Sequence, residues 1–238
     1  MIKKIGKLIA LIFLLAAMSV GCLAGLGYMD YKEAIDQTSI EDKMESIQSH
    51  EDYVTLEQLP ELYRKAVVAV EDHDFYEHQG IDIEAIGRAI LNNLKAMSFV
   101  EGGSTITQQL AKNEFFTQDK NFVRKFAEIF MAFDIESKYS KDQILEFYVN
   151  SIYFGEGYYG IHAASVGYFD VEPMHLNEAQ CILLAGIPNA PSVYSLHVNP
   201  VLAKQRAKQV LRQMVKYSFL SEAEAQNIAY QLDQMIVG

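Results

Sequence analysis

Ten residues in the first third of the chain, Glu71–Gly80 (EDHDFYEHQG), bring carboxylates and imidazoles together behind a purely apolar run, Ala66–Val70. Such side chains transfer protons in enzymes. If the stretch is helical, Glu71, Phe75 and His78 lie at i, i+4 and i+7 on one face, and the final glycine ends the helix. The apolar run predicts desolvation and a raised pKa for Glu71, which suits a general base. The alternative interpretation is a solvated acidic helix end.

A second cluster, Gly102–Asn113 (GGSTITQQLAKN), has the composition of a loop that leads into a helix. The free backbone N–H groups of a helix N-terminus favour an anion. Thr105, Gln109 and Lys112 would lie along one face of this helix. No Gly-Lys-Ser/Thr follows the glycines, so the Walker nucleotide-binding pattern is absent. The alternative is a capped amphipathic helix with polar outer residues.

A third cluster, Arg124–Glu128, interrupts an otherwise apolar helical segment, 122–135. Arg124 and Glu128 are four residues apart, which is also the spacing of a routine helix ion pair worth a few tenths of a kcal/mol. Taken alone, this cluster does not distinguish a site from a surface pair.

Charge is unevenly distributed along this chain of net charge −11. Residues 30–87 hold 16 acids and 4 bases, residues 88–141 hold 6 acids and 8 bases, and residues 142–238 hold 9 acids and 5 bases. A nucleic-acid partner is disfavoured by this acidity. A small anion such as a pyrophosphate would fit the middle segment if its bases converge; otherwise they are ordinary surface charges. The bases concerned are Arg88, Lys95, Lys112, Arg124 and Lys125.

The N-terminus predicts a membrane anchor. Three lysines precede the uncharged segment Leu8–Met29, which is long enough to cross a hydrocarbon core of about 30 Å. Lysines on the N-terminal side alone place the N-terminus in the cytoplasm and the rest outside. A cleaved signal peptide is the competing interpretation, and Ser19–Cys22 only faintly resembles a lipoprotein processing site. Cys22 and Cys181 are the only cysteines, so no disulfide framework is expected.

Apolar residues recur at three- and four-residue spacing after position 60, without alternating strands and crossover helices, so we expect a mainly α domain. We divide the chain into a cytoplasmic tip and transmembrane anchor at 1–29, a polar stalk or leading helix at 30–57, the main domain at 58–217 and a C-terminal helical tail at 218–238. Ser140 is expected to cap the helix that contains 144–150.

The ordered set of motifs resembles the peptidoglycan glycosyltransferase family, the transglycosylase module of bifunctional penicillin-binding proteins. The likeness covers roughly residues 55–215. The motifs that carry it are Glu71–Gly80, Gly102–Asn113, Arg124–Glu128, Ser140–Asn150, Tyr153–Ile161 and Leu184–Ser192.

This resemblance implies a lysozyme-like helical fold with a smaller membrane-associated subdomain, and polymerisation of lipid II into glycan strands by inverting glycosyl transfer. Glu71 would be the general base toward the acceptor 4-hydroxyl. Glu128 would act on the side of the undecaprenyl pyrophosphate leaving group. Lys112, Arg124 and Lys125 would stabilise its charge.

The other motif positions are expected to bind substrate. They are Asp72, Phe75, His78, Ser104, Thr105, Gln108, Gln109 and Asn113. The resemblance further implies assistance by Mg²⁺ or Mn²⁺, inhibition by moenomycin, and a location on the extracytoplasmic face of a bacterial cytoplasmic membrane. Lipid II, the growing glycan strand and the bilayer would be its partners.

Two features qualify the resemblance. Asp170 and Val171 follow Tyr168-Phe where the family commonly has a basic residue, and Leu196-His197 replaces a more usual Pro-Phe, which puts strand grip and processivity in question. No Ser-x-x-Lys tetrad occurs in the 238 residues, so we expect a monofunctional enzyme that relies on a separate transpeptidase.

Three alternatives remain at this point. A lytic muramidase would share the fold and Glu71 but cleave finished wall. A metal-dependent nucleotide-sugar transferase, suggested by the acids that follow 66–70, requires an α/β sheet that the helical patterning does not provide. A non-catalytic membrane-anchored scaffold would be indifferent to charge-neutral substitutions at Glu71 and Glu128.

Overall fold

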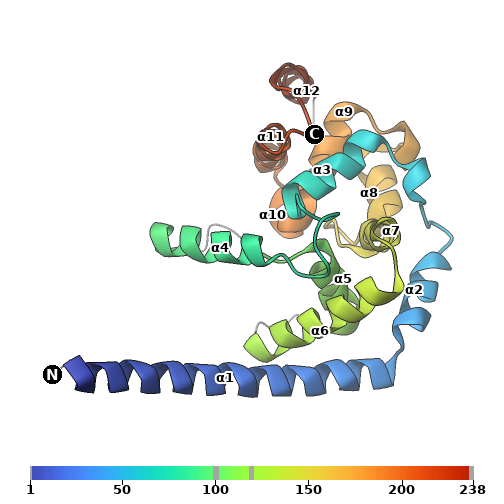
Figure 1. The fold of residues 1–238 in the computed structure, drawn as a ribbon. Coiled ribbons are helices and arrows are strands. Elements are labelled where there is room, and N and C mark those ends of the chain that lie inside the picture. The colour runs from blue at the N-terminus through green and yellow to red at the C-terminus, as the bar shows by residue number, and fades with distance from the viewer. Residues whose placement is uncertain (1, 99–101, 118–120, 236–238) are drawn as a thin grey trace.

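The computed structural model describes residues 2–98, 102–117 and 121–235. These residues form helices and no β-strand, apart from two isolated bridges (Figure 1). The expected mainly α fold is confirmed. The helices are α1 (Ile2–Gln37), α2 (Ile40–Gln48), η1 (Leu56–Gln58), α3 (Glu61–Glu71), α4 (Ile83–Ala96), α5 (Ile106–Phe115), α6 (Phe122–Lys138), α7 (Lys141–Ser151), α8 (Gly160–Phe169), η2 (Pro173–His175), α9 (Glu178–Gly186), η3 (Ile187–Asn189), α10 (Pro191–Tyr194), α11 (Pro200–Lys216) and α12 (Glu222–Gln234).

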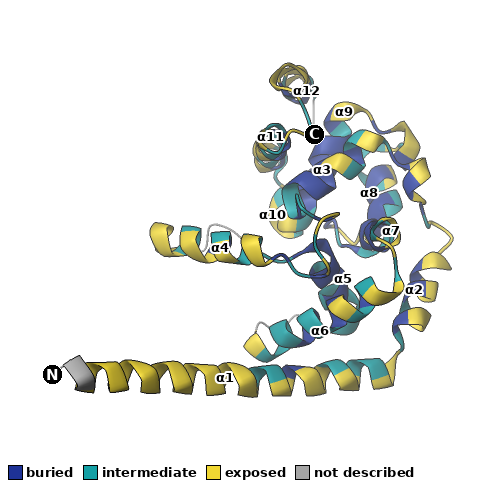
Figure 2. Cartoon of the chain, in the orientation of Figure 1, coloured by how far each residue is buried: buried dark blue, intermediate teal, exposed yellow. Residues whose placement is uncertain are grey.

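Helix α1 is long and apolar enough to cross a membrane, with a mean hydropathy of 2.5 over its most apolar window. None of this apolar part of α1 is buried against the rest of the protein. Figure 2 shows the N-terminal half of the helix exposed wherever it is described. The helix continues past the expected anchor into the region expected to be a stalk. The length and composition of α1 suit a membrane helix near the N-terminus, and a signal sequence would meet the same two criteria.

The C-terminal half of α1 packs against α6. The two backbones approach so closely at Gly27 that an added Cβ would lie 2.5 Å from Cβ of Phe126 and 2.7 Å from the carbonyl oxygen of Val123. Tyr28 meets Phe130 edge to face, with ring centroids 5.4 Å apart. One turn further on, the Tyr31 hydroxyl donates a 2.9 Å hydrogen bond to Asp134. These contacts couple the apolar helix directly to α6.

We expect Gly27→Ala to destabilise the protein by about 1–3 kcal/mol, because the added methyl group overpacks the contact between α1 and α6. Gly25→Ala is the matched control, since nothing lies within 4 Å of its added Cβ. Thermal unfolding of both variants in detergent measures the effect. Equal midpoints for the two variants would contradict the proposed close contact.

The buried residues of α3 fix the position of its last residue. Ala66, Val67, Val68 and Ala69 are all at most 3 % exposed, and α3 packs on α9 and α11. Burying such a run contributes about 25 cal/mol per Å² of apolar surface. It fixes the last residue of the helix, Glu71, at the boundary between the core and the solvent. As expected, Ser140 caps α7, where it forms a capping box with Gln143.

The Glu71–Gly80 stretch is not a helix, so the shared face that a helix would give Glu71, Phe75 and His78 does not form. Helix α3 stops at Glu71, and Asp72 takes a non-helical conformation (φ −163°, ψ 77°). Its carboxylate accepts a hydrogen bond from the backbone N–H of Ile106, at the start of α5. If α3 continued through Asp72, this carboxylate could not reach Ile106. Gly80 has the positive φ expected of it (77°), but at a turn packed on the backbone of Ala132.

Candidate active site

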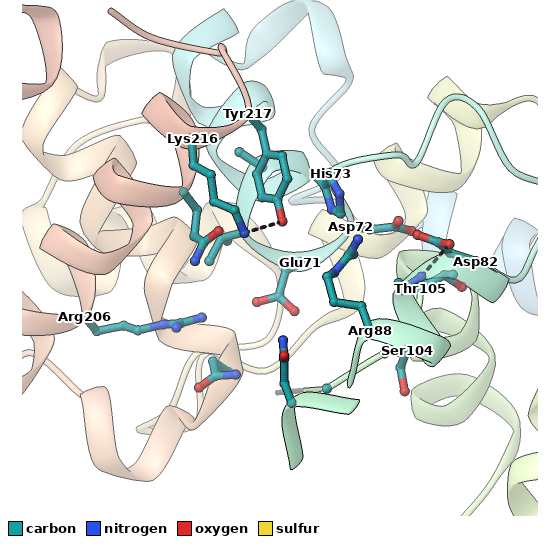
Figure 3. A pocket seen from close by; sticks show the side chains of 18 residues that line it. Glu71, Asp72, His73, Asp82, Arg88, Ser104, Thr105, Arg206, Lys216 and Tyr217 are labelled. Carbon is teal, nitrogen blue, oxygen red and sulfur yellow. Dashed lines mark hydrogen bonds between the residues drawn. The ribbon is translucent and has the colours of Figure 1, made fainter. Parts of the chain in front are cut away.

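A cavity of about 410 Å³ opens beside Glu71 (Figure 3). One wall comes from α4, another from α11, and its floor from the loop that leads into α5. In this view Glu71 lies between the side chains of Arg88 and Arg206. The polar and charged residues that line it are Glu71, Asp72, His73, Asp82, Arg88, Asn92, Ser104, Thr105, Asn189, Arg206, Gln213, Lys216 and Tyr217.

Glu71 is a buried carboxylate with one oxygen left without a partner. Its Oε2 accepts a 2.9 Å hydrogen bond from Nε2 of Gln109, whose Oε1 in turn accepts one from the Tyr148 hydroxyl at 3.2 Å. Its Oε1 is buried and has no hydrogen-bond partner. Burial raises the pKa of Glu71 above its ordinary value, and the hydrogen bond from Gln109 and the charge of Arg206 oppose the rise. The expected direction of the pKa shift is confirmed.

Asp72 joins the first two motifs. Its carboxylate receives the Ile106 N–H at 3.0 Å and contacts Nε2 of His78 at 2.9 Å. Thr105 adds a second link, donating from its hydroxyl to the carbonyl oxygen of Gly80 at 2.7 Å. The α5 N-terminus, where we expected an anion, thus already binds the protein's own carboxylate.

Glu128 lies in a basic cluster on α6 and is only 2 % exposed. Its Oε1 is 2.9 Å from Nε of Arg124, a contact without hydrogen-bond alignment, and its Oε2 receives a 2.9 Å hydrogen bond from Nζ of Lys125. Lys125 also donates to Oγ of Ser104 at 2.7 Å. Because Ser104 lines the Glu71 cavity, Lys125 connects the two sites.

Lys112 interacts electrostatically with both carboxylates. Burial lowers the pKa of Lys112, while the negative charges of Glu128 and Glu71 both raise it. The two acids therefore share one electrostatic neighbourhood, although Glu128 does not line the cavity beside Glu71.

Several residues expected to bind substrate have other surroundings. Phe75 is fully buried in the core, and His78 is held by Asp72, so neither lines the cavity with Glu71. Gln108 is fully buried and its Oε1 accepts from the Thr105 N–H, completing a capping box. Asn113, like Lys112, is half-buried on α5 and does not line this cavity.

The wall that α11 provides was not predicted from the sequence. Arg206 and Lys216 lie on this helix, and Tyr217 follows it, with its ring stacked on His73 at a centroid distance of 3.7 Å. A signal was present, because α11 carries five bases and no acid. The nine acids elsewhere in 142–238 outweigh these five bases, so the segment as a whole is acidic. Of the bases in the middle segment, Arg88 lines the cavity and Lys95 does not.

The described residues do not offer a metal site built by protein alone, since no three His, Cys, Asp or Glu side chains group around one point. Glu128, the acid nearest the basic cluster, is already neutralised by Arg124 and Lys125. Magnesium ions are often held by one or two carboxylates together with substrate phosphates.

Similarity to known proteins extends over most of this chain. The transglycosylase family profile matches residues 37–215. The chain is 48 % identical over 172 residues to penicillin-binding protein 1F of Bacillus subtilis, covering 72 % of this chain and 24 % of the relative. It is 37 % identical over 238 aligned positions to penicillin-binding protein 1A of Neisseria lactamica, covering 93 % of this chain and 30 % of the relative.

A crystal structure of penicillin-binding protein 1A from Haemophilus influenzae is also similar, with a TM-score of 0.46, 20 % identity, and coverage of 78 % of this chain and 18 % of that one. The chain spans less than a third of the length of the two curated relatives above. The extent of the profile match and the identity to these relatives show that the chain belongs to the transglycosylase family.

Proposed function

We propose that this protein polymerises lipid II into peptidoglycan glycan strands by inverting glycosyl transfer, with release of undecaprenyl pyrophosphate. The observation that carries the proposal is the buried, unpartnered oxygen of Glu71 at a cavity that Lys125 and Ser104 connect to the basic cluster around Glu128. Inverting transfer needs a base on one face of the reacting sugar and charge stabilisation on the other.

On the acceptor side, Glu71 would remove the proton from the attacking 4-hydroxyl. Gln109, itself held by the Tyr148 hydroxyl, donates to one carboxylate oxygen, and the other, Oε1, has no partner and would take that proton. The raised pKa makes the carboxylate a stronger base near neutral pH. The hydroxyl oxygen then attacks the anomeric carbon as its bond to the pyrophosphate oxygen breaks.

On the leaving-group side, Arg124, Lys125 and Lys112 would stabilise the negative charge that develops on the pyrophosphate. Glu128 would position the first two of these cations through its 2.9 Å contacts. The same proposal places the catalytic domain on the extracytoplasmic face of the membrane. Mg²⁺ or Mn²⁺, bound to the substrate's phosphates, would help to neutralise the negative charge of the pyrophosphate. A separate transpeptidase would cross-link the product.

Incubating the protein with labelled lipid II and, separately, with finished peptidoglycan tests the proposal. We expect glycan polymer from lipid II, suppressed by moenomycin, and no release of fragments from finished wall. A muramidase would give the reverse result, and an inert scaffold would give neither product.

The rate of transfer should rise with pH through an apparent pKa above 4.5, the ordinary value for a glutamate. The reason is that Glu71 must lose its proton to act as a base, and burial makes that loss harder. The pH profile of kcat/KM, which reports ionisations of the free enzyme, measures this. A rising limb centred at the ordinary value would contradict the proposed environment of Glu71.

A further inference from the structure

Four branched aliphatic side chains are exposed where α10 leads into α11. Their exposed fractions are 44 % for Val193, 64 % for Val198, 67 % for Val201 and 39 % for Leu202. We call these four residues the α10–α11 corner. The two helices pack together, with the Arg206 guanidinium 6.0 Å from the Tyr194 ring centroid. Apolar side chains gathered on an exposed surface indicate contact with a partner or a membrane.

The position of this corner favours a lipid partner. Figure 1 shows α4 projecting from the body in the direction in which the apolar end of α1 extends, and α10 and α11 lie at the edge of the body that faces the same way. Helices α4 and α11 also form facing walls of the Glu71 cavity. On α4, Ile90, Leu91 and Leu94 are between 54 and 70 % exposed. Exposed apolar residues therefore occur on both sides of the cavity.

Charge supports the same partner. Helix α11 carries Lys204, Arg206, Lys208, Arg212 and Lys216 and no acid. Arg206 and Lys216 line the Glu71 cavity, and Lys208 pairs with Asp233 on α12 at 2.6 Å. A basic helix that begins with exposed aliphatic residues suits the interface of a bilayer that contains anionic lipids.

We infer that the α10–α11 corner is a second lipid-contacting surface, on the opposite side of the cavity from α4. The two surfaces would place the opening beside Glu71 against the bilayer, so that a lipid-linked substrate enters without crossing water. This inference rests on the membrane anchoring in the proposed function and is independent of the transfer chemistry.

The chain contains no tryptophan, so a single introduced tryptophan reports on one position. We would place it by Val201→Trp in the full-length protein, reconstituted in vesicles of phosphatidylcholine and phosphatidylglycerol. Leu94→Trp on α4 serves for comparison. Met174→Trp is the solvent control, because Met174 is 60 % exposed and lines a separate cavity with residues of the loop after α2.

For Val201→Trp we expect a blue-shifted emission and quenching by brominated acyl chains at least half as strong as for Leu94→Trp. The Met174→Trp emission should be neither shifted nor quenched. Quenching of Val201→Trp no greater than that of Met174→Trp would overturn the inference. A blue shift without bromolipid quenching would also overturn it, since a protein surface would then cover the corner. The measurement uses no lipid II, so its failure is distinguishable from failure of the transferase assignment.

Discussion

Replacing Glu71 with glutamine should abolish polymerisation of lipid II. A positioned general base contributes about 10²–10⁴-fold to a rate, and glutamine cannot accept the proton. Glutamine keeps the size of the side chain, so its contact with Gln109 can persist and the cavity retains its shape. Turnover of labelled lipid II measures the effect, and a variant that retained wild-type turnover would overturn the assignment of the base.

The same substitution should leave the protein at least as stable as the wild type at pH 7. Burial raises the pKa of Glu71, which means that the folded protein binds its proton more tightly than the unfolded chain does. Stability from this group is therefore lost as pH rises through the two pKa values, and glutamine removes that loss. Thermal unfolding of Glu71→Gln at pH 5 and pH 7 checks the sign.

Glu114→Gln is the control for Glu71→Gln. Burial also raises the pKa of Glu114, but this residue lines a different cavity. Its Oε2 lies 3.8 Å from Nζ of Lys43. We expect Glu114→Gln to turn over lipid II at the wild-type rate. If Glu114→Gln lost as much turnover as Glu71→Gln, the loss would follow from neutralising any buried acid and would not identify Glu71 as the base.

The second large effect is expected at Glu128. Changing it to glutamine removes the negative charge between Arg124 and Lys125, which releases Lys125 from its position beside Ser104. Loss of such preorganised charge stabilisation should lower turnover by about 10²-fold or more. Breaking a buried ion pair should also cost about 3–5 kcal/mol of folding stability. Turnover and thermal unfolding must therefore be measured together.

Glu136→Gln separates these two effects of the Glu128 substitution. Glu136 lies on the same helix, and its side chain is 8 % exposed. It pairs with Lys141 at 2.7 Å and accepts from Thr107 at 2.6 Å, away from the Glu71 cavity. We expect a comparable loss of stability with turnover preserved. If both variants lost turnover in proportion to stability, Glu128 would have only a structural role.

Much of the fold was predictable because its determinants are local. The periodicity of apolar residues predicted the helices. Ser140 predicted the start of α7, because its side chain accepts a hydrogen bond from the N–H of Gln143, only three residues away. The raised pKa of Glu71 was also predictable, since it directly follows an apolar run that is buried in the core.

The rest depended on contacts between distant segments. Helix α3 ends at Glu71 because the Asp72 carboxylate accepts a hydrogen bond from the N–H of Ile106, 34 residues later, and no local pattern predicts that bond. Because the helix ends there, Phe75 and His78 do not share a helix face with Glu71. Phe75 is buried in the core, and His78 contacts Asp72. Arg206 reaches the cavity only through the packing of α11 against α3.

The central claim is that Glu71 and the Glu128 cluster act on the two ends of one reaction, in which a sugar hydroxyl displaces a lipid pyrophosphate. The most direct measurement follows lipid II consumption and lipid pyrophosphate release in one time course with the purified protein. We expect one lipid pyrophosphate to be released for each disaccharide joined to a lengthening strand. Consumption of lipid II without strand growth, or sugar joining without pyrophosphate release, would contradict it.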